Sequence, residues 1–376
     1  MFLLPIKIFF QVTLIIVCVS LWEIPATDCF AQQKTATTLN GIVKDAETDE
    51  NLRNANVYLS NTTIGTSTDS TGQFTMTTIP PGVFDLVVSL IGYERQIIAI
   101  QAISSETLYY NIKLTPILIQ TNEIIVTADQ PKEWQNNLSK FSTIFLGKSD
   151  FTNRCIIVNP EILNFSLLND TLIAQTNSIV IVDNKALGYR LYIALKEFVW
   201  NIDKDYGYYL IYPFFVQMPP KDIKEQTKWE NNRQRAYKGS LKNFLHSLVS
   251  KDTDADMFTI FSGPLKKLAS GEGHRVNPGD INIEPIEGTP LFSLNFPGFL
   301  RIEYGKRIGQ DYIEGGKYNR RWVRTTGVDD LRSVSIITLK SSLTYIDSLG
   351  NLFNPLSIEV SGMWGDKRVS ELVPID

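Results

Sequence analysis

The stretch from Gly41 to Tyr93 alternates apolar and polar residues and is interrupted by short turn sequences. Phe84–Leu90 places every second residue on an apolar face, which is typical of a strand that covers a core. Asp69-Ser70-Thr71-Gly72 has the signature of a type I turn, and Pro80-Pro81-Gly82 also favours a chain reversal. Closely spaced strands with such turns between them predict a β-sandwich.

Six or seven short strands are predicted in this first domain, which we place at residues 38–115. The recognisable ones are Thr38–Lys44, Ala55–Leu59, Gly65–Thr68, Gln73–Thr77, Phe84–Leu90 and Leu108–Leu114.

Several short motifs in this domain combine turn residues with apolar strand positions. They are Gly41-x-Val43-x-Asp45, Leu52-x-x-Ala55-x-Val57-x-Leu59, Gly65-Thr66-x-Thr68-Asp69, Gly72-x-Phe74, Pro80-x-Gly82, Leu86-x-Val88 and Ile91-Gly92-Tyr93. Together they resemble the carboxypeptidase regulatory-like domain, a transthyretin-like β-sandwich, and imply seven strands. The following Thr121–Ala128 is similar to the extension that joins this sandwich to the plug of TonB-dependent outer-membrane receptors. This resemblance implies the cell envelope of Bacteroidetes-type bacteria.

The amino-terminal segment predicts export. Lys7 precedes the apolar run Ile8–Leu21, which is shorter than the roughly 20 residues of a membrane-spanning helix. Small residues at Cys29 and Ala31 favour cleavage before Gln32, so residues 1–31 are predicted to be a signal peptide. Lipidation of Cys29 and an uncleaved anchor are the alternatives. We expect a periplasmic, outer-membrane-associated or cell-surface protein with no membrane-spanning segment in the mature chain.

Composition excludes several kinds of partner and chemistry. The formal net charge of −4 argues against a nucleic-acid partner, which requires a basic surface. Cys155 would be the one cysteine left after cleavage, so no intramolecular disulfide is expected. Zinc carboxypeptidases bind their metal with a His-x-x-Glu pair, but His246 and His274 are followed three residues later by Val249 and Asn277. We therefore predict no catalytic residues, metal or cofactor.

Two short motifs resemble known phosphate-binding and calcium-binding loops but lack a residue that each of those loops requires. Gly147-Lys148-Ser149 lacks the glycine that a phosphate-binding loop requires at position 142, which is Ser142. Asp252, Asp254 and Asp256 are followed by Met257 where a calcium-binding EF-hand loop requires glycine.

The second domain is predicted at residues 134–376, after a strand extension and linker at 116–133. Its expected strands are Ile156–Val158, Leu172–Ala174, Ile179–Val182, Tyr189–Trp200, Tyr206–Val216, Leu291–Phe296, Phe299–Tyr304, Ser333–Leu339, Leu343–Ile346 and Leu356–Val360. Helical periodicity covers Lys221–Tyr237 and continues after Gly239 to Val249. Either one long helix kinks at Gly239, or Ser240 caps a second helix. This part is similar to an uncharacterised carboxy-terminal region of other envelope proteins.

The whole chain is thus predicted to be mainly β with an α+β second part. It comprises an N-terminal seven-stranded transthyretin-like β-sandwich and a larger β-rich domain with one helical hairpin or long helix.

Candidate ligand-binding residues are Trp229, Arg233 and Tyr237, which share one helix face at a spacing of four residues. They either line a ligand cleft or pack on a sheet, with Arg233 paired to a carboxylate such as Glu230 or Glu197. Trp322 is the fourth candidate. It lies among Lys317, Arg320, Arg321 and Arg324, a cluster that is either a solvated loop or a contact patch for an acidic partner.

These observations favour a non-enzymatic binding or adaptor protein of the cell envelope, with the sandwich as the interaction module and an envelope or outer-membrane protein as its partner. The alternatives are a glycan-binding accessory protein in polysaccharide uptake, which requires exposed aromatic residues, and a hydrolase with an unrecognised site.

Overall fold

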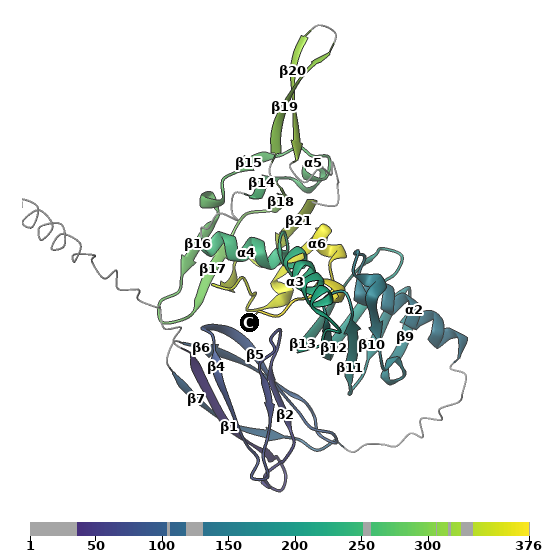
Figure 1. The fold of residues 1–376 in the computed structure, drawn as a ribbon, viewed down its shortest axis with the longest axis vertical. Helices are drawn as coiled ribbons and strands as arrows, with labels where there is room; N and C mark the ends of the chain where they lie inside the picture. The colour runs from purple at the N-terminus through teal and green to yellow at the C-terminus, as the bar shows by residue number, and fades with distance from the viewer. Residues whose placement is uncertain are drawn as a thin grey trace, which may run out of the picture. The chain divides into compact units, whose positions relative to one another are not determined.

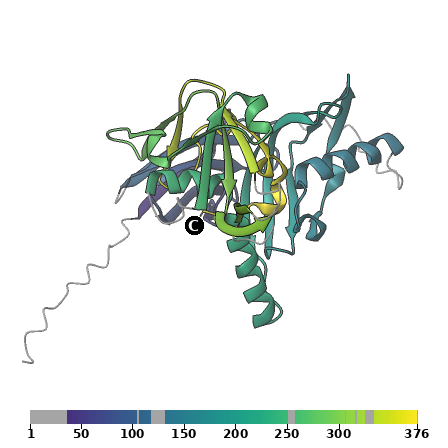
Figure 2. The same ribbon diagram turned by 90° about the horizontal axis from the view of Figure 1, so that it is seen from above.

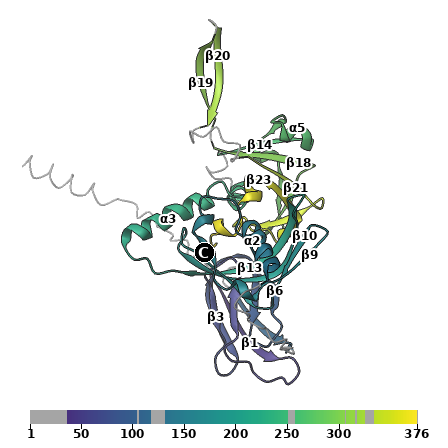
Figure 3. The same cartoon turned by 90° about the vertical axis from the view of Figure 1, so that its right-hand side faces the viewer.

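The computed structural model describes residues 36–103, 106–117, 131–250, 257–305, 307–314, 317–324 and 334–375, with the backbone alone for the two segments between 307 and 324. The predicted signal peptide, the extension at 121–128 and the aspartates at 252–256 lie outside the described residues. Residues Ala36–Asp376 form one compact unit. Figures 1, 2 and 3 show its elements from three directions. Within the described part, no helix has the length and apolarity needed to cross a bilayer.

The first seven strands form two facing sheets, which confirms the predicted sandwich (Figure 1). One sheet has the order β4–β1–β7 and the other β3–β2–β5–β6. The strands are β1 Thr37–Asp45, β2 Asn56–Leu59, β3 Gly65–Ser67, β4 Gln73–Ile79, β5 Gly82–Ser89, β6 Gln96–Ala102 and β7 Thr107–Leu114. The prediction omitted β6, because its run of adjacent isoleucines does not alternate with polar residues.

The core of the sandwich is built from alternating positions of its strands, as the sequence predicted for Phe84–Leu90. Leu39, Val57, Leu86 and Ile112 come from four different strands and are at most 3% exposed. Burial of each such side chain contributes about 1.5–3 kcal/mol relative to leaving it in water. The predicted turn after β3 is also present, since the Gly72 amide donates to the Asp69 carbonyl at 3.0 Å.

A six-stranded antiparallel sheet follows. Its path is β8–β11–β12–β10–β9, and β13 pairs with the other edge of β12. The strands are β8 Cys155–Ile157, β9 Asn164–Leu168, β10 Thr171–Gln175, β11 Ile179–Asn184, β12 Tyr189–Asn201 and β13 Tyr206–Gln217. The pairing of β12 with β13 extends along both strands and is interrupted between Leu195 and Glu197. It determines which side chains share each face of the sheet.

Helix α2, Lys132–Leu146, was not among the helices that the sequence predicted. Phe141 and Phe145 are both fully buried in the core of the six-stranded sheet. Their ring centroids lie 4.7 Å apart, as expected for residues one helical turn apart. The spacing of four residues between the two phenylalanines is compatible with a helix. The segment nevertheless contains too few apolar residues for the sequence to indicate a helix of 15 residues.

After β13, the described residues form two further sheets and a two-stranded pair, together with helices. Their paths are β15–β14–β18–β21–β23, β16–β17–β22 and β19–β20. The strands are β14 Phe258–Gly263, β15 His274–Val276, β16 Asn282–Pro285, β17 Leu291–Asn295, β18 Phe299–Tyr304, β19 Arg307–Glu314, β20 Lys317–Arg324, β21 Val334–Leu339, β22 Thr344–Asp347 and β23 Ile358–Gly362.

Helices α3, Ile223–Tyr237, and α4, Leu241–Ser250, are separate, which decides between the two alternatives at Gly239. The first helix ends at Lys238, whose backbone is extended with φ −60° and ψ 127°. Gly239, with φ +73°, then completes a turn in which the Ser240 amide donates to the Tyr237 carbonyl at 3.0 Å. The Ser240 hydroxyl then accepts from the Asn243 amide at 3.1 Å and caps the second. The remaining helical segments are α5 Leu265–Ala269, α6 Met363–Asp366 and the 3₁₀ turns Thr152–Arg154, Pro160–Ile162, Pro278–Asp280, Pro355–Ser357 and Val369–Glu371.

The sandwich is fastened to the six-stranded sheet by apolar contacts and by backbone hydrogen bonds. Tyr58 and Val87 of the sandwich pack with Ala194 of β12. The Asn61 amide donates to the Pro213 carbonyl at 2.7 Å, and the Phe215 amide donates to the Thr62 carbonyl at 3.0 Å. The loop between β2 and β3 therefore continues the hydrogen-bonding of the larger sheet at the edge of β13.

Candidate functional site

Helix α3 is held on the turn between β11 and β12 by the residues that the sequence singled out. Trp229 is 5% exposed, and its indole N–H donates to the Lys185 carbonyl at 3.1 Å. Asn232 donates from Nδ2 to the Ala186 carbonyl at 2.8 Å. Trp229 therefore serves the packing of the fold and has little surface to offer a ligand.

Arg233 has different partners from those expected. Its Nε donates to the Leu187 carbonyl at 2.8 Å, and its guanidinium carbon lies 4.0 Å from the centroid of the Tyr189 ring. The expected pairing with Glu230 or Glu197 is replaced by a backbone carbonyl and an aromatic face. The reason is geometric, because the helix lies over a turn whose carbonyls point toward it.

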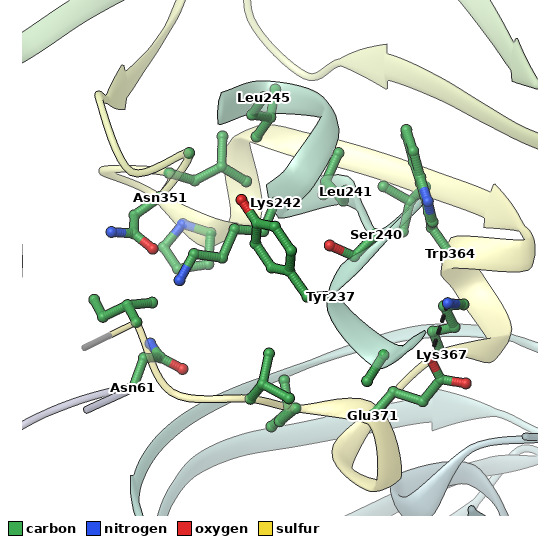
Figure 4. Close-up of a pocket in the computed structure, with 18 of the residues that line it drawn as sticks. Asn61, Tyr237, Ser240, Leu241, Lys242, Leu245, Asn351, Trp364, Lys367 and Glu371 are labelled. Carbon is green, nitrogen blue, oxygen red and sulfur yellow. Dashed lines mark ion pairs between the residues drawn. The ribbon is translucent and has the colours of Figure 1, made fainter. Parts of the chain in front are cut away.

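Tyr237, at the end of α3, lines a cavity of about 310 Å³ (Figure 4). The walls come from α3, α4, the segment after β22 and the last residues of the chain. Apolar lining residues are Ala236, Leu241, Leu245, Leu352, Pro355, Val360, Trp364, Leu372, Val373 and Ile375. Figure 4 shows Lys242, Asn351 and Asn61 on one side of the Tyr237 ring and Lys367 and Glu371 on the other.

The charged groups at this cavity are largely engaged within the fold. Lys367 Nζ lies 2.9 Å from Glu371 Oε2, and the two side chains are only 20% and 12% exposed. Arg368 donates to the carbonyls of Gly365 at 2.8 Å and Ile144 at 2.6 Å. The cavity is therefore a mainly apolar recess with a few polar groups, an arrangement common in sites for small molecules.

A second hollow, of about 530 Å³, lies between the sandwich and the six-stranded sheet. Its lining residues are Asn56, Val57, Tyr58, Gly65, Thr66, Ser67 and Ser89 from the sandwich, and Ile179, Tyr192, Phe214 and Val216 from the sheet. We call this hollow the junction groove. Sequence reasoning missed it, because its two walls are far apart in the chain and no local pattern links them.

The outer edge of β7 is a third feature with an accessible surface. β7 ends its sheet, and no described strand pairs with its outer side. Tyr109 on this strand is 68% exposed. An unpaired strand edge presents backbone donors and acceptors to any extended chain that approaches it.

The described residues offer little for nucleophilic or metal chemistry. Among them, no group of three or more His, Cys, Asp or Glu residues is placed to bind a metal ion. Cys155 is 8% exposed, and burial raises the pKa of its thiol to about 12, which keeps it protonated at neutral pH. Trp322 lies on β20 opposite Gly309, and its side chain lies outside the described structure. Ligand binding by the four predicted residues stays a prediction.

Comparison with known proteins bears on the first domain. Residues 39–126 match the family described as CarboxypepD_reg-like domain. The match places a carboxypeptidase regulatory-like domain in this part of the chain. The match confirms the resemblance seen in the sequence motifs, and it concerns a regulatory-like sandwich rather than a catalytic peptidase domain. No curated protein matches the chain.

Several solved structures resemble part of this chain at low TM-scores. A type II cohesin–X-dockerin complex from Acetivibrio cellulolyticus is 18% identical over 21% of this chain and 58% of its own, with a TM-score of 0.20. The shaft pilin SpaA from Lactobacillus rhamnosus GG is 19% identical over 23% and 49%, with a TM-score of 0.19. Catechol 1,2-dioxygenase from Acinetobacter sp. ADP1 is 15% identical over 28% and 59%, with a TM-score of 0.20. Each alignment spans less than two thirds of the other chain, and likeness at this level carries no functional argument.

Proposed function

We propose that this protein is a non-enzymatic binding protein of the cell envelope, exported by its amino-terminal segment, in which the carboxypeptidase regulatory-like sandwich binds a protein partner. The open edge of β7 carries this proposal. An extended segment of the partner adds to the edge as a further strand, with main-chain hydrogen bonds providing affinity.

The geometry of β7 suits such pairing. It pairs with β1 in unbroken parallel register from Thr38 opposite Thr107 to Asp45 opposite Leu114. A strand without a bulge presents a regular row of backbone groups on its free side.

The side chains of β7 leave most of this edge unprotected. Natural edge strands commonly carry charged residues that prevent unwanted pairing. Here Thr107–Asn111 is uncharged, and Lys113, near the end of the strand, lies 3.0 Å from Asp49. The first five positions of the strand are therefore the part on which a partner strand is expected.

Site-specific photocrosslinking in intact cells tests this proposal. We expect p-benzoylphenylalanine at Tyr109 to give one discrete adduct with an envelope protein. The same group at Phe353, which is 42% exposed in a loop, serves as the matched control and should give no such adduct. Asn111→Pro removes a backbone donor from the strand and should abolish the adduct. Equal adducts from both positions, or none from Tyr109, would contradict edge pairing.

The cavity at Tyr237 favours a second candidate function, the binding of a small and mainly apolar ligand. Trp229 and Arg233 then act indirectly, because they fix α3 on the Lys185–Gly188 turn and so position Tyr237 at the cavity. The tail of the chain completes the wall with Leu372. Because its walls come from separate segments of the chain, the cavity exists only in the folded protein.

Fluorescence titration with anilinonaphthalene sulfonate, a probe of apolar recesses, tests this function. Leu352→Trp places a large ring in the cavity wall and should abolish saturable binding. Phe353→Trp alters the next residue, whose side chain is 42% exposed, and should retain it. Saturable binding that is the same in both variants would show that the probe binds elsewhere.

A further inference from the structure

We propose that the junction groove is a binding site for an uncharged oligosaccharide. It is distinct from the edge of β7 and from the Tyr237 cavity, so it does not depend on the function proposed above. The inference rests on the chemistry of two opposing walls and on the contacts that fix the distance between them.

The wall formed by the six-stranded sheet is aromatic and apolar. Tyr192 of β12 lies directly opposite Phe214 of β13 in the strand register. Ile179 and Val216 complete this wall, and Val216 is 40% exposed. Gly65 of the sandwich lies against Phe214, since a β-carbon at that position would come within 2.8 Å of the ring. Phe214 therefore lies in direct contact with the sandwich.

The wall formed by the sandwich is polar and uncharged. Asn56 of β2 lies opposite Ser67 of β3 on one side and Ser89 of β5 on the other. This row of one amide and two hydroxyls crosses three strands, and all three residues line the groove. Amides and hydroxyls both donate and accept hydrogen bonds, as the hydroxyls of a sugar also do.

No Asp, Glu, Lys or Arg is among the described residues that line the groove. The next row of the larger sheet contains Asp183 opposite Arg190, but these two charges satisfy each other. Arg190 donates from Nε to Asp183 Oδ1 at 2.6 Å and from a terminal nitrogen to Oδ2 at 2.9 Å. The lining of the groove therefore supplies no ionic partner that would replace the hydration lost by a charged ligand.

The two walls together favour a ligand that is apolar on one face and polar around its edge. A sugar ring has an apolar face, which suits an aromatic wall, and hydroxyls around its edge, which suit the row at Asn56. Fixed uncharged polar groups beside aromatic surfaces are the usual composition of a specific ligand site. A peptide strand is disfavoured, because little free strand edge borders the groove. The edge strand β3 has only three residues, and the edge of β13 already pairs with the loop at Asn61 and Thr62.

The groove is held in a fixed shape by contacts on both of its walls. Tyr58 donates from its hydroxyl to the Tyr212 carbonyl at 3.1 Å, and its ring centroid lies 5.2 Å from that of Phe214. The Ile375 amide donates to the Asn61 carbonyl at 3.0 Å, next to the junction between the loop and β13. A preformed groove reduces the entropy that binding must overcome.

Isothermal titration calorimetry with the whole folded protein tests the proposal. The probes are the neutral hexasaccharides of maltose, cellulose, laminarin, xylan and mannan type, with hexagalacturonate as the charged counterpart. Ser67→Trp fills the groove and Asn56→Leu removes its amide, and both positions are exposed, so the fold should tolerate them. Asn164→Leu makes the same change at an exposed position of β9 outside the groove lining and serves as the matched control, with circular dichroism confirming that all variants fold.

The expected result is that at least one neutral hexasaccharide binds, with affinity reduced at least tenfold by Ser67→Trp and by Asn56→Leu and unchanged by Asn164→Leu. Hexagalacturonate should bind at least tenfold more weakly than that neutral probe. Failure of every neutral probe to bind overturns the proposal. Equal binding by the groove variants and the wild type, or equal binding of the charged probe, also overturns it.

Discussion

The indole ring of Trp229 lies against the α-carbon of Gly188, so closely that a β-carbon at position 188 would overlap the ring. Gly188 also has φ +71°, a conformation that favours glycine. One residue without a side chain thus allows α3 to rest on the turn before β12, and the position of Tyr237 depends on that contact.

Gly188→Ala should destabilise the protein by about 2–4 kcal/mol, because it combines a steric overlap with a strained backbone. Chemical denaturation monitored by tryptophan fluorescence measures the change. Gly279→Ala is the control, since a β-carbon there meets nothing within 4 Å, and it should be close to neutral. A loss below about 0.5 kcal/mol for Gly188→Ala would show that the helix moves away at little cost.

Asp347 joins the sandwich to the carboxy-terminal part and should be sensitive to removal of its carboxylate. It is fully buried and accepts from the Val83 amide at 3.2 Å and from the Leu349 and Asn351 amides at 2.9 Å each. Asp347→Ala leaves these donors without an acceptor and should cost about 3 kcal/mol or more. Calorimetric unfolding should give a lower Tm, whereas the exposed Asp203→Ala should leave Tm unchanged.

Asp85 predicts a pH dependence at the junction between the sandwich and the larger sheet. Burial raises the pKa of this carboxyl to about 6. Its neighbour Tyr212 has its pKa raised to about 12, first by burial and then by the charges of Asp85 and Glu197. The junction therefore favours the protonated, uncharged form of Asp85.

The sign follows from comparing the folded and unfolded states. Below pH 4 the carboxyl is protonated in both states, whereas above pH 6 it is ionised in both and the folded state bears the cost of burying the charge. The stabilising effect of the protonated form is thus lost as pH rises from 4 to 6. Asp85→Asn should match the wild type at pH 4 and exceed its stability by about 2 kcal/mol at pH 7. Equal stability of the two proteins at both pH values would contradict the raised pKa.

Cys155 should be nearly unreactive in the folded protein. Its thiol is buried, and its pKa is raised to about 12 by that burial. Because the thiolate is the reactive form, alkylation by iodoacetamide at pH 8 should be at least about 100-fold slower in the native protein than in guanidinium chloride. Peptide-resolved mass spectrometry measures the rate at this residue, and similar rates in both conditions would contradict its burial.

Local sequence signals predicted the sandwich well because its turns have specific chemical requirements. Asp69 and Gly72 form the turn that their identities predict. Ser240 caps α4, which is one of the two alternatives predicted at Gly239. Local signals were weaker for α2, whose buried face rests on few apolar residues such as Phe141 and Phe145. The partners of Arg233 were wrongly expected to be carboxylates, since a sequence does not show which carbonyls a folded turn will expose.

By itself, the sequence determined most strands, the turns and the family of the first domain, because alternation and turn chemistry act over a few residues. Only the tertiary structure brought Asn56 and Ser67 to face Tyr192 and Phe214, since these residues meet through contacts between distant segments. The same holds for the cavity at Tyr237, which the last residues of the chain help to enclose. Local patterns specify elements, whereas the hollows between elements arise from long-range packing.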